Sequence, residues 1–343
     1  MNQIEIDKFV GIINANHSFL LTCHNNVDGD ALGSTLGLRQ LLINMGKEAT
    51  VVTPDLPPSY YSWMPGFKTI KAYDRDIENC NSIVDAVDVL IMLDFNDIGR
   101  LDVMGDKISS VSKPTIIVDH HTNPTLSADA FLSEPEASAT CSILADLIKT
   151  VGWSNFIDTD VATNLYTGII TDTGGLSYSS NNPEIYYTVA DLLKYGIDKM
   201  YIHDKIFNNK DLRRLKLIGF SLLRRLHRVA KLPLTITALT IEDLDKFNYF
   251  TGDAEGLVNI PLQSKDVIAN ALILERPDMI KLSIRSKGDF YVNDFAAQYF
   301  EGGGHVNAAG GKFRGSLDDA VALYKEGIVK HYEEWLKKKS QQS

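Results

Sequence analysis

The sequence is short of cysteine and of long apolar runs. Its three cysteines, Cys23, Cys80 and Cys141, are widely spaced and form no C-x-x-C motif, so the sequence indicates neither a disulfide framework nor a thiolate zinc site. We expect buried thiols. No apolar run approaches the roughly 20 residues that span a bilayer, and no basic N-terminal stretch precedes an apolar one. The expectation is therefore a cytoplasmic protein without a membrane segment.

Positive charge is the second shortage. Lysine and arginine number 34 against 44 aspartates and glutamates, which gives a net charge of −10. Because affinity for long duplex nucleic acid comes from neutralising many phosphates, this balance argues against a general duplex binder. An anionic substrate remains open if a metal ion or local positive charge is concentrated in one cleft. The 343 residues, 44% hydrophobic and 23% charged, suffice for two globular domains.

The first half of the chain alternates strand-like and helix-like segments. Apolar runs of strand length occupy residues 19–23, 49–53, 88–94 and 114–121. Helical spacing of apolar residues follows at 32–45, 139–149 and 160–170, and a further helix begins at Pro183. Strands that are apolar on both faces are typical of a parallel sheet covered by helices. The sequence therefore predicts an α/β fold with a Rossmann-like parallel sheet, and a polar loop over residues 122–136.

The second half has a different texture. A long helical pattern with an apolar stripe predicts a helical connector over residues 198–229. Strand-like runs then occur at 234–240, 267–274 and 279–285, the last two flanking the turn at Arg276-Pro277-Asp278. We predict a catalytic domain over 1–197, the connector, and a smaller mixed α/β domain over 230–343. Only residues 337–343 suggest a frayed tail.

The segment after the first predicted strand carries the strongest chemical signal. His24, Asp28 and Asp30 lie within seven residues, on a loop that we expect Gly29 to bend. The carboxyl ends of parallel strands are where ligands bind in open α/β sheets. One imidazole and two carboxylates form a ligand set that suits divalent cations such as Mn²⁺. The alternative is an Asx-rich turn in which Asp30 caps the next helix.

Further acids and histidines stand at the ends of other predicted elements of this sheet. They are Asp94, the run Asp119-His120-His121, and Asp172. Six nitrogen and oxygen ligands suffice for two cations if Asp94 bridges them. Two metals roughly 3.5–4 Å apart are the usual device for activating a hydroxide and clamping the oxygens of a displacement at phosphorus. His17, His203, His227 and His331 have no such company, and we interpret them as structural.

Together these fragments resemble the ordered motifs of a known family. The segments His24-Asn25-x-x-Asp28-x-Asp30-Ala31-x-Gly33-Ser34, Asp94, Asp119-His120-His121 and Thr171-Asp172-Thr173-Gly174 are similar to the four motifs of the DHH phosphoesterase superfamily. Arg285-Ser286 and Gly302-Gly303-Gly304-His305-x-x-Ala308-Ala309-Gly310 resemble its DHH-associated substrate domain. The resemblance covers almost the whole chain and is greatest to the bifunctional oligoribonuclease and pAp phosphatase group, the nanoRNases.

The resemblance implies roles for the residues of the first domain. His24 and Asp28 would bind one Mn²⁺, while Asp30, His120 and Asp172 would bind the other, with Asp94 bridging. Mg²⁺ and Co²⁺ are the alternative metals. Asp119 would orient a histidine and fix its tautomer. His121 would contact the phosphoryl group as a hydrogen-bond donor or general acid.

In the second domain the resemblance implies a substrate site. Arg285 and Ser286 would hold a substrate phosphate, and Gly302, Gly303 and Gly304 would let backbone amides approach an anion. His305 would lie beside the scissile phosphate. A plain flexible turn is the alternative for the glycine run. Glu301 stands where relatives often carry a fourth glycine and Val306 where they carry a basic residue, which leaves the anchoring of longer or more highly charged substrates open.

The implied function is a phosphoesterase with two metal ions, whose substrate lies between the two domains. It would hydrolyse very short oligonucleotides to mononucleotides, pAp to AMP and phosphate, or both. Linear or cyclic dinucleotides, pyrophosphate and short polyphosphate are alternative substrates. A catalytically silent nucleotide-binding regulatory module and an Asp-rich structural-metal protein are alternatives of other classes, and a homodimer is left open.

Overall fold

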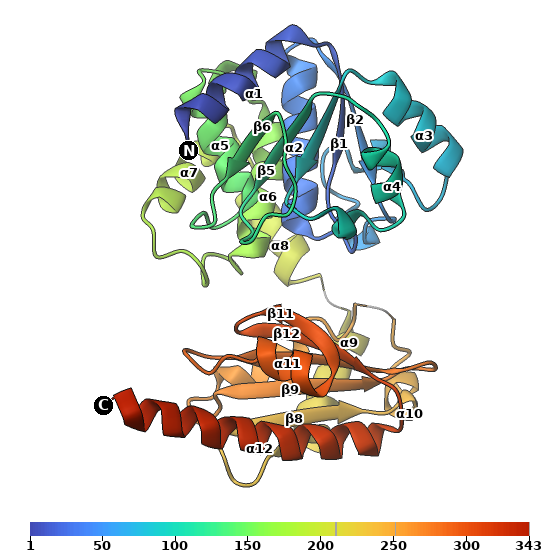
Figure 1. The fold of residues 1–343 in the computed structure, drawn as a ribbon, viewed down its shortest axis with the longest axis vertical. Helices are drawn as coiled ribbons and strands as arrows, with labels where there is room; N and C mark the ends of the chain where they lie inside the picture. Colours follow the sequence, from blue (N-terminus) through green and yellow to red (C-terminus); the bar gives the residue numbers. More distant parts are fainter. Residues whose placement is uncertain (210, 251, 343) are drawn as a thin grey trace. The chain divides into compact units, whose positions relative to one another are not determined.

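The computed structural model describes residues 1–209, 211–250 and 252–342. The chain divides into two compact units, Met1–Asn209 and Lys210–Ser343 (Figure 1). Each unit has its own six-stranded sheet and its own hydrophobic core. None of the described helices is both long and apolar enough to cross a membrane.

The first unit is built on a fully parallel sheet in the order β3-β2-β1-β4-β5-β6. Its strands are β1 (Ser18–Thr22), β2 (Glu48–Thr53), β3 (Lys71–Ala72), β4 (Val89–Leu93), β5 (Thr115–Asp119) and β6 (Ala130–Ser133). The chain runs outward from β1 to one edge and then returns to β4 to build the other half. This order is that of a Rossmann-like sheet, and it creates a crevice between the ends of β1 and β4. The predicted fold class is confirmed.

Helices cover both faces of this sheet (Figure 1). They are α1 (Gln3–Ala15), α2 (Gly29–Asn44), α3 (Ile77–Ala86), α4 (Met104–Ser109), α5 (Thr140–Thr150), α6 (Thr159–Asp172), α7 (Glu184–Leu193) and α8 (Lys199–Phe207). Alternate residues of β1 show the two layers, because side chains alternate along a strand. Phe19 and Leu21 pack in the core with α1, α2, α5 and α6, whereas Leu20 packs with α3 and α4.

The second unit has a mixed sheet in the order β11-β12-β10-β9-β8-β7. Its strands are β7 (Leu226–Arg228), β8 (Leu234–Leu239), β9 (Ala269–Glu275), β10 (Ile280–Ser286), β11 (Glu301–His305) and β12 (Ala308–Phe313). Among the described strands of this second sheet, only β8 and β9 pair in parallel. Its α-helices are α9 (Leu212–Phe220), α10 (Ile241–Asp245), α11 (Asn293–Tyr299) and α12 (Leu317–Gln342).

The segment predicted as a connector is organised differently. Residues 198–229 are not one helix, because α8 ends at Phe207 and α9 begins at Leu212. Ile202 of α8 packs in the core of the first unit, and Leu217 of α9 packs in the second. A π-helical turn and strand β7 complete the segment. Apolar periodicity alone does not reveal that the two halves of the pattern pack in different cores.

Two further expectations are corrected. The polar loop predicted over 122–136 contains strand β6, a short edge strand paired with β5, whose side chains alternate between buried and half-buried. The tail predicted as frayed is helical as far as it is described, since α12 extends to Gln342. In both cases a polar composition concealed a regular element, because a short edge strand and the end of a surface helix need few apolar residues.

Candidate metal centre

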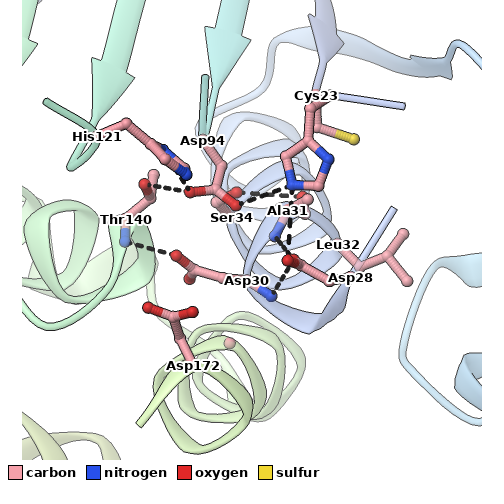
Figure 2. Close-up of polar contacts among 12 residues, drawn as sticks. Cys23, Asp28, Asp30, Ala31, Leu32, Ser34, Asp94, His121, Thr140 and Asp172 are labelled. Atoms are coloured by element: carbon pink, nitrogen blue, oxygen red, sulfur yellow. Dashed lines mark hydrogen bonds and ion pairs between the residues drawn. The ribbon is translucent and has the colours of Figure 1, made fainter. Parts of the chain in front are cut away.

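The acids and histidines predicted as ligands gather at the carboxyl edge of the parallel sheet. His24 follows β1, Asp94 follows β4, and Asp119 ends β5 and is followed by His120 and His121. The central pair of these strands, β1 and β4, forms the crevice at which the strand order reverses, where ligands bind in this class of sheet. Asp28 and Asp30 enter from the start of α2, and Asp172 from the last residue of α6. Figure 2 shows the carboxylates directed into one space.

His24, Asp28 and Asp94 form the first group of potential metal ligands. Their side chains each offer one ligand atom, and these atoms lie within 4.8 Å of one another. The His24 Nε2 atom lies 3.6 Å from Asp28 Oδ2 and 3.4 Å from Asp94 Oδ2. The other ring nitrogen, Nδ1, lies 2.7 Å from the backbone carbonyl of Asn25, to which it donates a hydrogen bond. This contact holds the ring with Nε2 toward the acids, the orientation that a metal-ligating histidine requires.

Asp30, His120 and Asp172 form the second group, again with one ligand atom each within 4.8 Å of the others. His120 Nε2 lies 3.6 Å from Asp94 Oδ1 and 3.7 Å from Asp172 Oδ2. Its Nδ1 atom lies 3.3 Å from the carbonyl of Ala137. Asp94 thus presents one carboxylate oxygen to His24 of the first group and the other to His120 of the second.

Asp94 is held for this position by its backbone and by a hydroxyl group. It is 2% exposed and has a φ of 66°, in the left-handed region that aspartate and asparagine tolerate better than most residues. Its amide donates to the carbonyl of Val118 on β5, and its Oδ1 accepts a 2.9 Å hydrogen bond from the Thr140 hydroxyl. The carboxylate is therefore fixed in rotation as well as in place.

Two carboxylates near the start of α2 act as helix caps. Asp28 is the N-cap of α2 and accepts hydrogen bonds from the amides of Asp30 and Ala31. Asp30 instead caps α5, because its two oxygens accept from the amides of Thr140 and Cys141 at 2.6 and 3.0 Å. Figure 2 shows the bond from Thr140. The Asx-turn alternative is thus half right: a cap exists, but Asp28 rather than Asp30 supplies it to α2.

The side chains of the two ligand groups include more acids than histidines. Burial, and then the charges of Asp94 and Asp172, raise the pKa of Asp30 well above its usual range. Burial also raises the pKa of Asp172 to about 6, with His120 opposing the rise. Burial alone would lower the pKa of His24, but contacts with Asp28 and Asp94 outweigh it and raise this pKa to about 10. These raised pKa values show that the clustered acids favour a nearby positive charge, which a divalent cation would supply.

His121 and Asp119 form a separate pair beside the two groups. Asp119 is buried, and its carboxylate accepts hydrogen bonds from the His121 ring Nδ1 at 2.7 Å and from the His121 amide at 3.0 Å. The hydrogen bond to Asp119 raises the pKa of His121. His121 Nδ1 also lies 3.9 Å from Asp94 Oδ1, so Asp94, His120 and His121 form a third group within 4.8 Å. Because Nδ1 is engaged by Asp119, the pairing favours an orienting role for Asp119.

The second unit contains a groove over the glycine-rich strands. The glycine run is not a flexible turn: it is strand β11, which forms a hairpin with β12. The groove has a volume of about 630 Å³, and its lining includes four basic side chains and small residues of β11 and β12. The basic residues are Arg276, Lys281, Arg285 and Lys312, and Glu301, Gly303 and Gly304 also line the groove.

The structure separates Arg285 from Ser286, which we predicted to act together. Arg285 lines the groove, and its guanidinium donates to the carbonyls of Ile284 and Ala309. Burial lowers its pKa. Ser286 is the next residue on β10, so its side chain points to the other face, where its hydroxyl accepts from Asn307. Gly302 lies outside the groove lining, and His305 is exposed at the end of β11.

Residue-by-residue reasoning missed the groups that hold the ligands. Thr140 and the amide of Cys141 bind two predicted ligands, and nothing in their sequence context marked them. Lys281 and Lys312, paired across β10 and β12, add charge to the groove. Charged and apolar residues alternate on β10, and Ile280, Leu282 and Ile284 are buried on the opposite face. This alternation could have indicated from sequence that Lys281 shares a face with Arg285.

Comparisons with known proteins agree with this architecture. Residues 18–169 match the DHH family N-terminal domain, and residues 234–338 match the DHHA1 domain. A solved structure of an exopolyphosphatase-related protein from Bacteroides fragilis is 38% identical, with a TM-score of 0.95 and 98% of both chains covered. The structure of RecJ with Mn²⁺ from Thermus thermophilus shares the fold at 11% identity, with a TM-score of 0.54, 96% of this chain and 54% of that chain covered.

Curated relatives match over most of their length. The bifunctional oligoribonuclease and PAP phosphatase NrnA of Thermus thermophilus is 29% identical over 312 residues, which is 90% of this chain and 88% of the relative. The protein of the same name from Bacillus subtilis is 24% identical over 306 residues, 88% of this chain and 91% of the relative. The chain therefore belongs to the DHH family and combines a DHH N-terminal domain with a DHHA1 domain.

Proposed function

We propose that this protein is a phosphoesterase that uses two divalent metal ions, most favourably Mn²⁺, to hydrolyse very short oligoribonucleotides and pAp. The observation that carries the proposal is the position of Asp94. Its two carboxylate oxygens face His24 and His120, which belong to different ligand groups. A shared carboxylate between two three-residue groups is the arrangement that a two-metal phosphoesterase needs.

Each ligand group would hold one ion. His24 and Asp28 would bind the first, and Asp30, His120 and Asp172 the second, with Asp94 shared. When bound, the pair of ions supplies a hydroxide at neutral pH and draws charge from the phosphoryl oxygens. The raised pKa values of Asp30 and Asp172 support this assignment, because cations would relieve the mutual repulsion of these buried acids.

The chain's own residues would do the remaining work at phosphorus. His121, oriented by Asp119, is placed to donate a proton or a hydrogen bond to the phosphoryl group. The raised pKa of His121 keeps the imidazole protonated to a higher pH, and a protonated ring is the form that can donate in this way. Asp119 also holds the ring in one orientation, which lowers the entropy lost when substrate binds.

The groove of the second unit would hold the phosphate and sugar of the substrate. Arg285 offers a planar guanidinium that no carboxylate neutralises among the residues described by the structure. Lys281 and Lys312 extend the positive charge along the groove. The backbone of Gly303 and Gly304, without a Cβ, allows close approach of an anion. His305, at the end of β11, would lie beside the scissile phosphate of the substrate. The separate position of Ser286 leaves Arg285 as the main phosphate ligand of that pair.

The substrate class is proposed from the relatives. Those named NrnA are curated as oligoribonucleases and PAP phosphatases and match this chain over at least 85% of their length. The test is a side-by-side assay of pAp, pApA, cyclic di-AMP and pyrophosphate with Mn²⁺. We expect turnover of pAp and pApA; tight pAp binding without turnover of any substrate would instead favour a regulatory nucleotide-binding module.

A further inference from the structure

We propose that Thr140 is a positioning residue of the metal centre, because it links the shared ligand Asp94 to the second-group ligand Asp30. The inference rests on the proposed two-metal function. Thr140 is the first residue of α5 and is completely buried. Its hydroxyl donates to Asp94 Oδ1 at 2.9 Å, and its amide donates to Asp30 Oδ2 at 2.6 Å (Figure 2).

The hydroxyl bond selects the orientation of the shared carboxylate. A carboxylate can rotate about its terminal torsion, because this torsion is broad. In the structure Asp94 Oδ1 lies 3.6 Å from His120 Nε2, and Oδ2 lies 3.4 Å from His24 Nε2. A donor on Oδ1 occupies one of its lone pairs and leaves the other toward His120. Thr140 thus holds each oxygen toward one ligand group.

The amide bond places the second ligand relative to the first. Asp30 is completely buried and accepts from the amides of Thr140 and Cys141, the first two residues of α5. The N-cap of α5 is Ala139, whose side chain cannot supply this cap. Asp30 therefore cannot shift without leaving the start of α5 unsatisfied. Because one residue provides both donors, α5 fixes the separation of Asp30 and Asp94.

The same segment also reaches a third ligand. The carbonyl of Ala137, three residues before Thr140, lies 3.3 Å from the Nδ1 atom of His120. Partners of this kind, which touch ligands without touching the metal, typically change metal affinity 10- to 100-fold when they are removed. The segment 137–141 therefore does more than begin a helix, because its hydrogen bonds reach Asp30 and His120 of the second group and the shared carboxylate of Asp94.

The test separates the hydroxyl from the rest of the residue. Thr140→Val keeps the shape and the backbone amide but removes the hydroxyl, while Thr140→Ser keeps the hydroxyl. The matched control is Thr167→Val, because Thr167 is also buried in a helix but its hydroxyl donates only to the backbone carbonyl of Thr163. Mn²⁺ affinity and stoichiometry are measured by titration calorimetry, the spin coupling of bound Mn²⁺ by electron paramagnetic resonance, and unfolding by thermal melting without metal.

We expect Thr140→Val to bind Mn²⁺ at least 10-fold more weakly and to lose kcat with little change in KM. Thr140→Ser and Thr167→Val should bind Mn²⁺ within about threefold of the wild type. A folded Thr140→Val variant with unchanged Mn²⁺ affinity and coupling overturns the inference and leaves a helix-capping role. If Thr140→Val does not fold, the Ser variant decides: a 10-fold loss of affinity in that variant also overturns it.

Failure of the proposed function gives a different result. If the wild type binds two Mn²⁺ ions but hydrolyses none of the four substrates, the function is wrong. In that case the Mn²⁺ titration of the Thr140 variants still decides whether Thr140 positions the ligands. If the wild type hydrolyses pAp and Thr140→Val binds Mn²⁺ and reacts as the wild type does, only the inference about Thr140 is wrong.

Discussion

Replacing Asp94 by asparagine tests the shared-ligand arrangement most directly. Asparagine keeps the size of the side chain and, like aspartate, tolerates the positive φ of 66° at this position, where alanine would add backbone strain. The change removes one negative charge from a side chain that is 2% exposed and faces both ligand groups. The hydrogen bond from Thr140 is preserved in geometry, because an amide oxygen can replace Asp94 Oδ1 as its acceptor.

The expected loss follows from the charge that is removed. Two unit charges about 4 Å apart interact by about 4 kcal/mol at an effective dielectric constant of about 20. That energy corresponds to about 10³-fold in a rate or a binding constant. Since Asp94 faces both groups, we expect kcat on pAp to fall by at least about 10³-fold and the affinity for both Mn²⁺ ions to weaken. In the metal-free protein, the pKa of Asp172 should fall below about 6, because Asp94 contributes to its rise.

The measurements are steady-state hydrolysis of pAp and calorimetric titration of Mn²⁺ into the metal-free protein. The control is Asp102→Asn, because Asp102 also has a positive φ of 50° but lies exposed on a loop outside the ligand groups. We expect the control to match the wild type in both assays. A folded Asp94→Asn variant with full occupancy by two ions and more than about a tenth of the wild-type kcat would refute the shared-ligand reasoning.

Four further predictions concern packing, pH and the substrate groove. A Cβ at Gly168 would lie 2.2 Å from Cys141 Sγ on α5 and 2.8 Å from Asp30 Oδ1 on α2, so Gly168→Ala should destabilise the protein by about 1–3 kcal/mol and weaken Mn²⁺ binding. The control Gly11→Ala adds a Cβ into open space and should do neither. Urea unfolding and Mn²⁺ titration measure both effects. In the metal-free protein the pKa of His24 is raised to about 10, and those of Asp30 and Asp172 are raised as well. Binding of Mn²⁺ at pH 7 should therefore release at least about one proton, measurable in buffers of different ionisation enthalpy, and affinity should fall more steeply below pH 6. The raised pKa of His24 also stabilises the metal-free fold fully below pH 6.5 and progressively less as the pH rises toward 10, so a metal-free melting temperature insensitive to pH between 7 and 10 contradicts the assignment. Arg285→Gln should raise KM for pAp about 10-fold with kcat changed less than threefold, and an unchanged KM would exclude Arg285 as a phosphate ligand.

The sequence predicted the sheet and its ligand-bearing edge because both depend on local pattern. Continuous apolar runs identified β1, β4 and β5, and each run ends next to a side chain that can bind metal. Parallel strands place such ends on one edge, so convergence followed from the fold class. Several elements escaped prediction, and among those with weak local patterns are α1, α3 and the short strand β6. Their stability comes from contact with the rest of the core, which no single window of sequence contains.

Hydrogen bonds from the backbone were beyond prediction for a different reason. Every residue except proline carries an amide, so the amides of Thr140 and Cys141 have no signature that marks them as partners of Asp30. Asp30 and Thr140 are 110 residues apart in the sequence, so whether they meet depends on how α2 and α5 pack. The alternation on β10 did hold information that was not used: Arg285 and Ser286 are adjacent on a strand and therefore had to face opposite sides.

Gly29 shows how one glycine can be predicted correctly as special and yet for the wrong reason. We expected it to bend the loop, but it is the first residue of α2 and its φ is not positive. A Cβ at this position would instead lie 2.3 Å from Thr171 Oγ1 on α6. Gly29 precedes Asp30 and Thr171 precedes Asp172, so this close approach of the two helices lies beside two acids of the second ligand group. The absence of one side chain thus limits how near these carboxylates can approach, and the proposed metal centre depends on helix packing as much as on its ligands.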